Sequence, residues 1–391
     1  MLGLGLGLQK QIMIGFNLGK MQPIATFTRP TPAYLSDGKR VAANVPRFEP
    51  GKFGKALMVE EKTTNLLVKD LDTGGSGSLI DILVPNKVWA KRITVEANNF
   101  FYLGTISVPA QPNTKYTLTC WARLVSGSVV SGTRIYIGSD SQGVQGVASL
   151  NIDTQLTSEW KKFVITGQTD ANATTLTCAA FRVQTDTGCT VEIADWQLEA
   201  KPYATSFIDG TRAAETLTIP SYVLNPQEGT VACWVYVNSA SKYPNRYSTI
   251  FMAVAGGAGK GIWLHHSNKT NCWEYQIKDE SNNSKVITVA DSETPTGWHF
   301  FTIKWKSTEA KLFVDGALKG TMENPYLPSA IQKIDIGCWG AGNQPNSLID
   351  ELRIDKIARS DEEILAAYQS GQPLPMDKWT TYKANFDKKI R

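Results

Sequence analysis

The sequence predicts an all-β protein with an irregular N-terminal segment followed by two antiparallel β-sandwich (jelly-roll) domains. The 391 residues include 32 glycines and 11 tryptophans, and Thr, Val and Ile recur in short runs. This composition favours short strands and tight turns. Hydrophobic residues make up 42% and aromatic residues 10% of the chain, which is typical of a folded protein. At roughly 150 residues per domain, the length predicts two or three domains.

Charge and hydropathy argue against two classes of partner. The formal net charge of +4 is weak for this length, so we expect no nucleic-acid partner. No run of about 18 apolar residues occurs, so we expect no membrane partner. The apolar start Met1–Leu8 lacks a basic region, and we interpret it as not a signal peptide. The six cysteines are scattered and predict reduced, buried thiols, although a disulfide pair stays open.

Residues 1–66 are irregular and contain an ordered series of short motifs. The series is Phe27-Thr-Arg29, Asp37-Gly38, Ala42-Ala-Asn-Val-Pro-Arg-Phe48, Leu57-Met-Val-Glu-Glu61 and Thr64-Asn-Leu-Leu67. It resembles the N-terminal segment of bacteriophage and prophage virion proteins of the tail-fibre and head-spike group, which implies docking to a larger particle. Pro30 and Lys62 depart from that pattern. The alternative is that Arg29, Arg47 and Glu60 pair within a small domain.

The sequence of residues 67–208 predicts the first sandwich. A run of Gly and Ser at residues 72–78 indicates a surface loop or a flexible joint. Strand-like runs of sandwich length and spacing follow it. They include Lys115–Leu124, Trp160–Thr166 and Cys189–Glu199, and Ala204–Ile208 closes the unit. From about residue 79 the order of these runs resembles the carbohydrate-binding-module jelly rolls of phage fibres.

Residues 209–372 predict the second sandwich. Residues 228–237 are apolar on both faces, as in a central strand that is covered on both sides. Asp315-Gly316 predicts a hairpin turn. The stretch 347–355 predicts a closing strand, with Leu352 and Ile354 on one face and Asp350 at its rim. Glu351, Arg353 and Asp355 would lie on the opposite face.

A helix is predicted directly after the closing strand. Ser360 and Glu363 form a capping box, and Gly371 ends the helix. Strand and helix together resemble the C-terminal signature of the laminin-G-like, concanavalin A-like jelly rolls, which implies a recognition module. The tail, residues 373–391, is either a solvated end or an arm that packs on a neighbouring subunit; its aromatic residues favour the arm.

Aromatic and amide side chains are the candidates for sugar binding, which needs a flat ring face and directional polar groups. Asn268, Asn271 and Asn346 belong to the wider set of loop amides. Trp339, in a glycine-rich loop, is the best candidate because such loops lie at sheet rims. The predicted glycan-binding residues are Trp339, Trp263, Trp273, Tyr275 and Asn343.

Calcium is the one candidate cofactor. In related jelly rolls an Asp of the closing strand holds calcium at a sheet rim, and Asp350 occupies that place in this sequence. The alternative is that Asp350 caps a turn through neighbouring backbone groups. Zinc is not expected, because the adjacent His265 and His266 point to opposite faces of a strand.

We expect no enzymatic activity. Glycoside hydrolysis needs two carboxylates about 5–9.5 Å apart. Glu351 and Asp355 share a strand face, but four residues at about 3.3 Å each separate them by roughly 13 Å. Arg353 stands between them and would hold a carboxylate ionised. A pair assembled from different strands stays open.

Together the three resemblances predict a phage or prophage virion structural protein, assembled in the cytoplasm of a host bacterium. Its sandwiches would mediate adhesion to host cell-surface glycans. Its expected partners are other virion proteins, the glycan and further copies of itself; fibres are typically trimers, although no heptad run supports one here. The alternatives are a capsid or tail decoration protein with no receptor role, and a glycan-cleaving depolymerase.

Overall fold

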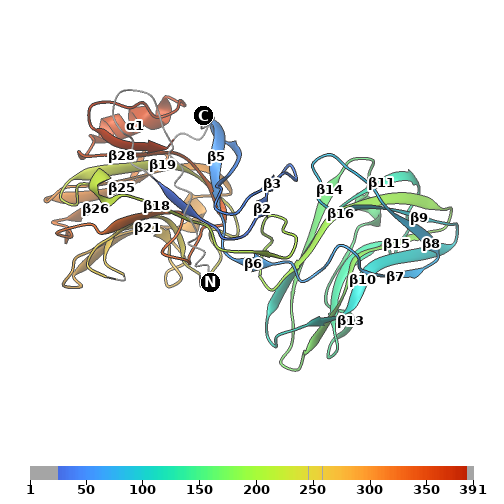
Figure 1. The fold of residues 1–391 in the computed structure, drawn as a ribbon. Coiled ribbons are helices and arrows are strands. Elements are labelled where there is room, and N and C mark those ends of the chain that lie inside the picture. Colours follow the sequence, from blue (N-terminus) through green and yellow to red (C-terminus); the bar gives the residue numbers. More distant parts are fainter. Residues whose placement is uncertain (1–24, 245, 258, 385–391) are drawn as a thin grey trace, which may run out of the picture. The chain divides into compact units, whose positions relative to one another are not determined.

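The computed structural model describes residues 25–244, 246–257 and 259–384, and these fall into two compact units. Unit 1 is built from residues 25–32, 41–62 and 213–384, and unit 2 from residues 33–40 and 63–212. Both units are almost entirely β, as predicted (Figure 1). The predictions for Met1–Leu8 and for the last basic residues of the tail concern residues outside the described ranges.

Unit 1 is a sandwich of two large antiparallel sheets. The first has seven strands in the order β1-β18-β27-β20-β21-β22-β23. Their bounds are β1 Thr26–Thr28, β18 Thr216–Ile219, β20 Ser248–Val254, β21 Gly261–His266, β22 Trp273–Lys278, β23 Ser284–Val289 and β27 Lys333–Ile336.

The second sheet of unit 1 has eight strands. Seven follow the order β26-β25-β24-β19-β28-β5-β4, and β29 pairs with β28. Their bounds are β4 Arg47–Gly51, β5 Gly54–Val59, β19 Gly229–Val237, β24 Gly297–Trp305, β25 Glu309–Val314, β26 Ala317–Glu323, β28 Ser347–Asp355 and β29 Thr380–Ala384.

One hydrophobic core lies between these two sheets, because alternate residues of their strands point inward. It includes Trp273, Tyr275 and Trp305, each 0% exposed. The central strand β19 is also covered on its other face, as predicted, where Trp234 packs against Phe300 at a ring distance of 5.3 Å. The helix α1 (Asp361–Gln369) covers that face (Figure 1).

Unit 2 is a second sandwich, of two five-stranded sheets in the orders β13-β12-β15-β10-β7 and β14-β11-β16-β9-β8. The bounds are β7 Asp72–Gly75, β8 Gly77–Asp81, β9 Ala90–Val95, β10 Asn99–Pro109, β11 Lys115–Gly127, β12 Arg134–Ser139, β13 Gly143–Asn151, β14 Lys161–Gln168, β15 Thr175–Thr185 and β16 Cys189–Glu199. Two small sheets pair β6 (Thr63–Thr64) with β17 (Thr211–Arg212) and β2 (Ala33–Tyr34) with β3 (Arg40–Val41). Between the five-stranded sheets lies a core that contains the fully buried Trp196.

The compact units are divided differently from the four predicted segments. Residues 41–62 group with the C-terminal half of the chain. Strand β1 joins the seven-stranded sheet through Thr26 opposite Thr218, and β5 joins the eight-stranded sheet through Val59 opposite Ser347. The N-terminal strands therefore complete the sheets of unit 1.

Local turn and cap predictions are confirmed. Asp315 and Gly316 both have positive φ in the β25–β26 hairpin, as a turn of this type requires. The Ser360 side chain accepts from the Glu363 backbone, and the Glu363 side chain accepts from the Ser360 backbone, which completes the capping box.

The predicted alternation of the closing strand holds only after residue 351. Glu351 has φ of 50°, and the pairing of β28 with β19 shifts register at this point, which marks a β-bulge. Because of the extra residue, Ile349 and Leu352 both face the core, three positions apart. The bulge leaves Asp350 and Glu351 on the outer side, both 1% exposed.

The tail pairs within its own chain as far as the structure describes it. Strand β29 lies antiparallel to β28, with Tyr382 opposite Ile354, and Tyr382 is 2% exposed. The Thr380–Ala384 part of the tail is therefore packed in unit 1 and is not a solvated end, whereas residues 375–378 are exposed. The arm on a neighbouring subunit stays a prediction.

All six cysteines are unpaired, and five are buried: Cys120, Cys178, Cys189, Cys233 and Cys338. Burial raises the pKa of the Cys120 and Cys233 thiols to about 12, so both stay protonated. Among the residues that the structure describes, no helix is both long enough and apolar enough to span a membrane.

Candidate functional site

The candidate site lies on the outer face of the seven-stranded sheet in unit 1. Inward residues such as Ile334 and Ile336 build the core, so their neighbours on the strands point to the opposite face. Register places Thr218 opposite Asp335, Asp335 opposite Met252, and Met252 opposite Trp263. One row of outward side chains therefore crosses strands β18, β27, β20 and β21.

Four rings form what we call the aromatic ledge: Tyr247, His265, Trp263 and Trp339. The ring centroids of Trp263 and Trp339 lie 5.1 Å apart, those of Trp263 and His265 5.5 Å, and those of Tyr247 and His265 5.4 Å. Trp339 is half-buried, and Trp263 is 8% exposed over Met252 and Val254. Trp339 thus gives the ledge an indole that solvent can reach.

The ledge contains two polar atoms whose hydrogen-bonding capacity is unused. Nε1 of Trp263 and Nδ1 of His265 are buried and have no partner within the described residues. Leaving a buried donor or acceptor unsatisfied costs about 1–3 kcal/mol. Such atoms are uncommon in folded proteins, and each calls for an explanation such as a bound water, an ion or a functional role.

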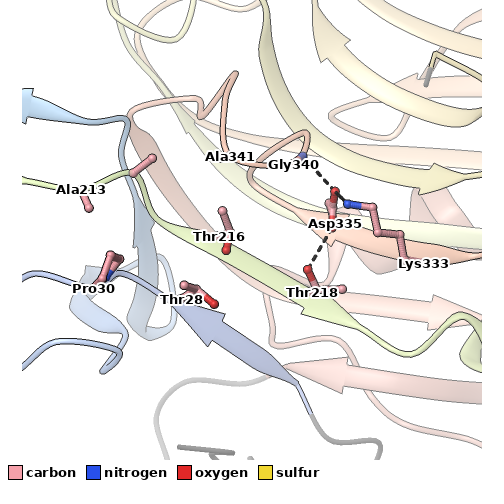
Figure 2. A pocket seen from close by; sticks show the side chains of 10 residues that line it. Thr28, Pro30, Ala213, Thr216, Thr218, Lys333, Asp335, Gly340 and Ala341 are labelled. Atoms are coloured by element: carbon pink, nitrogen blue, oxygen red, sulfur yellow. Dashed lines mark hydrogen bonds and ion pairs between the residues drawn. The ribbon is translucent and has the colours of Figure 1, made fainter. Parts of the chain in front are cut away.

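A shallow pocket of about 440 Å³ lies on the same face, beside the turn that carries Trp339 (Figure 2). Three of its threonines, Thr28, Thr216 and Thr218, come from β1 and β18. On β27, Lys333 and Asp335 form an ion pair of 2.7 Å.

Asp335 anchors both the pocket and the ledge. Figure 2 shows its carboxylate meeting three groups: the Thr218 hydroxyl at 2.9 Å, the Lys333 ammonium at 2.7 Å and the Gly340 backbone N–H at 3.0 Å. Gly340 belongs to the tight turn in which Trp339 and Gly342 exchange backbone hydrogen bonds. The carboxylate therefore positions the turn that presents the Trp339 ring.

The structure separates the five predicted glycan-binding residues into two groups. Trp263 and Trp339 lie together on the ledge, and Asn343 follows the Trp339 turn, where its carbonyl accepts from the Thr249 backbone. The structure corrects the prediction that Trp273 and Tyr275 bind a glycan. Both are 0% exposed and point into the core of unit 1, so neither ring offers a face to a sugar.

Asp350 makes the contacts of a turn cap. Its Oδ2 accepts from the Phe53 N–H at 3.0 Å and its Oδ1 from the Glu351 N–H at 2.8 Å. A Cβ at Gly51 would lie 2.7 Å from that Oδ2, so the β4–β5 turn needs glycine there. Burial raises the pKa of Asp350 to about 6. Within the described residues no three His, Cys, Asp or Glu side chains gather as a metal site. Calcium at Asp350 stays a prediction that none of these contacts supports.

The predicted opposite orientation of the two adjacent histidines is confirmed. His265 faces the ledge and pairs with Glu274 at 3.2 Å. His266 lies on the core side against Trp273, and its Nε2 is 3.2 Å from Asp291. Desolvation lowers the pKa of His266.

The carboxylates of the closing strand are held by cations. Glu351 pairs with Lys383 at 2.8 Å. Asp355 pairs with Arg353 and Arg359, each at 3.0 Å. Arg359 in turn holds Asp377, whose pKa it lowers to about 2. Each of these carboxylates is engaged by at least one cation, so the network is structural.

The N-terminal motif residues form a closed ionic cluster in unit 1, which we define as Arg29, Arg47, Glu60 and Glu215. Glu215 accepts from Arg29 at 2.7 Å and from Arg47 at 2.6 Å, and Arg47 also pairs with Glu60 at 2.7 Å. All four are 0–3% exposed. Arg47 and Glu60 therefore pair as the alternative interpretation expected, whereas Arg29 pairs with Glu215, which lies outside residues 1–66.

The neighbouring motif residue Asn44 takes part in the same fastening. Its side-chain oxygen accepts from the Arg29 backbone N–H at 3.0 Å, and its own N–H donates to the Arg29 carbonyl at 2.7 Å. The Arg29 guanidinium donates to the Ala42 carbonyl at 2.7 Å. These contacts hold the Phe27-Thr-Arg29 and Ala42–Phe48 motifs together within unit 1.

Sequence reasoning missed Asp335, Lys333 and Tyr247. The alternation Lys333-Ile-Asp-Ile336 shows that two polar residues share a face, but it does not identify the neighbours across the sheet. Those neighbours are set by the pairing of β27 with β18 and β20, which is non-local.

Comparison with known proteins supports one of the three resemblances. Residues 209–365 match the model of the laminin-G family described as the concanavalin A-like lectin/glucanases superfamily. That segment is therefore a domain of this type, as expected, although the match spans less than half of the chain. A search of curated protein sequences finds no match.

Solved structures show only distant likeness. The binding domain of botulinum neurotoxin serotype D is 19% identical, with 41% of this chain and 44% of that one covered at a TM-score of 0.34. The binding domain of botulinum neurotoxin DC in complex with SialylT is 17% identical; the match covers 41% of this chain and 40% of that one, with a TM-score of 0.34. The CBM40 of the Ruminococcus gnavus IT-sialidase is 14% identical; the match covers 36% of this chain and 82% of that one, with a TM-score of 0.29. At TM-scores this low, none of these likenesses carries a functional conclusion.

Proposed function

We propose that this protein is a non-catalytic glycan-binding protein and that the outer face of the seven-stranded sheet in unit 1 is its binding surface. The observation that carries the proposal is the aromatic ledge, where the half-buried Trp339 lies against Trp263, whose indole N–H is unpartnered. The match of residues 209–365 to a family that includes lectins supports it.

The chemistry of the surface suits a saccharide. The apolar C–H face of a sugar ring stacks on an aromatic plane, and Trp339 offers one. Sugar hydroxyls need both donors and acceptors at the rim of the ring. In the adjoining pocket the threonine hydroxyls of β1 and β18 can supply both, and the partly exposed Lys333 ammonium adds donors.

The glucanase activity named in the same family description is the competing function. It would require a pair of carboxyls with separated pKa values facing one cavity. In the described part of the pocket lining, Asp335 is the only carboxylate, and it is engaged by Thr218, Lys333 and Gly340. The observed geometry therefore favours binding over hydrolysis.

We further propose, from the motif order in residues 27–67, that the protein functions as part of a phage or prophage virion. Multiple copies on one particle would convert weak glycan contacts into firm adhesion. Immunogold labelling of particles, or mass spectrometry of purified virions, tests this part independently of binding. Recovery of the protein only in free form would contradict it.

The binding surface is tested by a glycan array on the full chain, with the Trp339→Ala variant alongside. We expect at least one glycan to bind and the variant to lose about fivefold or more in affinity, since stacking of a ring on an indole face is worth about 1 kcal/mol. Trp379→Ala, which removes another half-buried tryptophan of unit 1, is the matched control and should bind as the wild type does. Equal loss in both variants would contradict the assignment.

A further inference from the structure

Unit 2 contains a separate group of aromatic and basic side chains on the sheet β14-β11-β16-β9-β8. The Lys87 ammonium lies 3.5 Å from the ring centre of Trp121 and 5.8 Å from that of Trp160. The Arg123 guanidinium lies 5.0 Å from the Trp160 ring. Two indoles therefore gather two cations at one place on this sheet.

The two cations differ in how their charge is balanced. Arg123 pairs with Glu192 at 2.7 Å, and Arg92 pairs with the same carboxylate at 2.6 Å. Lys87 has no carboxylate within ion-pair distance among the described residues; an indole face holds it instead. A cation on an indole keeps its charge and the N–H groups that point away from the ring.

A cavity of about 130 Å³ is lined by Trp121, on whose ring the Lys87 ammonium lies, and by Val88, the residue that follows Lys87. Trp121, Lys162, Asp195, Thr119 and Phe207 are among its lining residues. An engineered cavity of similar size, about 150 Å³, holds a benzene ring, so this one takes a single six-membered ring or its substituent and not a long chain.

Asp195 enters the cavity because of a bulge in β16. Its φ is 46°, and the pairing of β16 with β11 shifts register at this point. Its Oδ1 accepts from the Val88 and Trp89 N–H groups, both at 2.9 Å. Its Oδ2 makes no hydrogen bond among the described residues, so this oxygen can accept from a ligand hydroxyl.

Burial disfavours the charged form of both ionisable groups at this place. Desolvation lowers the pKa of Lys87 and raises the pKa of Asp195. A half-desolvated ammonium recovers part of its lost hydration when an anion binds it. Lys162 and Asp195 line the cavity, and Lys87 and Lys162 both act on the Asp195 carboxylate.

We propose that this place in unit 2 is a second binding site, which takes an acidic saccharide. Its carboxylate or sulfate would bind the Lys87 ammonium, and a ring hydroxyl would donate to Oδ2 of Asp195. An inorganic anion would use only the first contact, and a neutral sugar only the second. The site shares no residue with the aromatic ledge and does not depend on it.

The test is calorimetric titration of the full chain with trigalacturonate, with its methyl ester, with a heparin tetrasaccharide and with inorganic sulfate. The ester keeps the rings and removes the charge. We expect at least one acidic oligosaccharide to bind tenfold or more tightly than both the ester and sulfate. Affinity should fall as salt rises. Failure of both acidic oligosaccharides to bind, equal affinity for the ester, or sulfate binding as tight as the saccharide would overturn the proposal.

Variants locate the binding. Lys87→Gln should reduce affinity for the acidic oligosaccharide by tenfold or more. Lys69→Gln, which removes an exposed unit 2 lysine paired with Asp81, is the matched control and should have no effect. Trp339→Ala should also have no effect, which separates this site from the one proposed in unit 1. Unchanged affinity in Lys87→Gln, with the circular dichroism spectrum preserved, would overturn the assignment.

Discussion

The ionic cluster and the aromatic ledge are both groups of largely buried polar side chains in unit 1, yet their hydrogen-bonding states differ. In the cluster, Arg29 and Arg47 converge on Glu215 and each charge has a counter-charge. On the ledge, Trp263 and His265 each keep a polar nitrogen without a partner. The difference teaches that burial alone does not identify a binding residue. Unpartnered atoms alone do not identify one either, because Trp273 and His266 on the core side also keep a nitrogen that is unpartnered within the described residues. What sets the ledge apart is that its unpartnered nitrogens lie beside Trp339, which solvent reaches.

The largest expected effect on the free energy of unfolding comes from removing the shared carboxylate of the ionic cluster. Glu215→Gln removes the carboxylate shared by two fully buried arginines, and breaking a buried pair costs about 3–5 kcal/mol. Urea unfolding measures the change in the free energy of unfolding. Glu309→Gln is the control: its surface pairs with Lys306 and Lys311 should contribute under about 1 kcal/mol. Equal losses in the two variants would remove the distinction between a closed cluster and a surface pair.

The next largest effect is expected at Asp335, because this residue contributes both to the stability of unit 1 and to the position of Trp339 on the aromatic ledge. Asp335→Ala removes the acceptor for Thr218, Lys333 and Gly340. We expect a loss of about 1–3 kcal/mol in the free energy of unfolding. Glycan affinity should fall as well, because the Trp339 turn loses its anchor. Affinity unchanged by this variant would show that the turn does not need Asp335.

A smaller effect is expected at the helix that covers the eight-stranded sheet. Ser360→Ala removes the acceptor for the Glu363 N–H, and such a change costs about 1 kcal/mol. Ser360→Asp should restore most of the loss, because aspartate also caps helices. Thermal and urea unfolding measure both. Since α1 lies away from the ledge, glycan affinity should stay at the wild-type value in both variants.

The smallest expected effect is a pH dependence of the free energy of unfolding, caused by the hydrogen bond between His299 and Asp315. The hydrogen bond from His299 to Asp315, 2.7 Å long, raises the pKa of His299 above 6.5. The charged imidazole therefore stabilises the folded state below pH 6.5, and this contribution is lost as pH rises through the folded-state pKa. His299→Gln should flatten the decline in unfolding free energy between pH 6 and pH 9. A wild-type decline identical to that of the variant would contradict the assignment.

Contacts between sequence neighbours could be predicted. The capping box at Ser360 and the Asp315-Gly316 turn depend on residues one to three positions apart, so their chemistry is legible in the chain. The opposite directions of His265 and His266 follow from strand geometry alone.

What depends on pairing across the sheets could not be predicted. Thr26 meets Thr218 and Val59 meets Ser347, and nothing local specifies such partners. Trp263 and Trp273 have the same residue type and similar surroundings in sequence. One faces the ledge and the other the core, because strands β21 and β22 present these positions to opposite sides.

The central claim is that a glycan completes the aromatic ledge, and indole N–H signals in a ¹⁵N–¹H spectrum of the full chain test it most directly. Addition of a glycan that binds on the array should shift the indole signals of Trp263 and Trp339, assigned by single Trp→Phe substitutions. The indoles of Trp196 and Trp305, which already donate to the Val68 and Asn225 carbonyls, should stay in place. A bound glycan that leaves the Trp263 and Trp339 signals unmoved would contradict the claim.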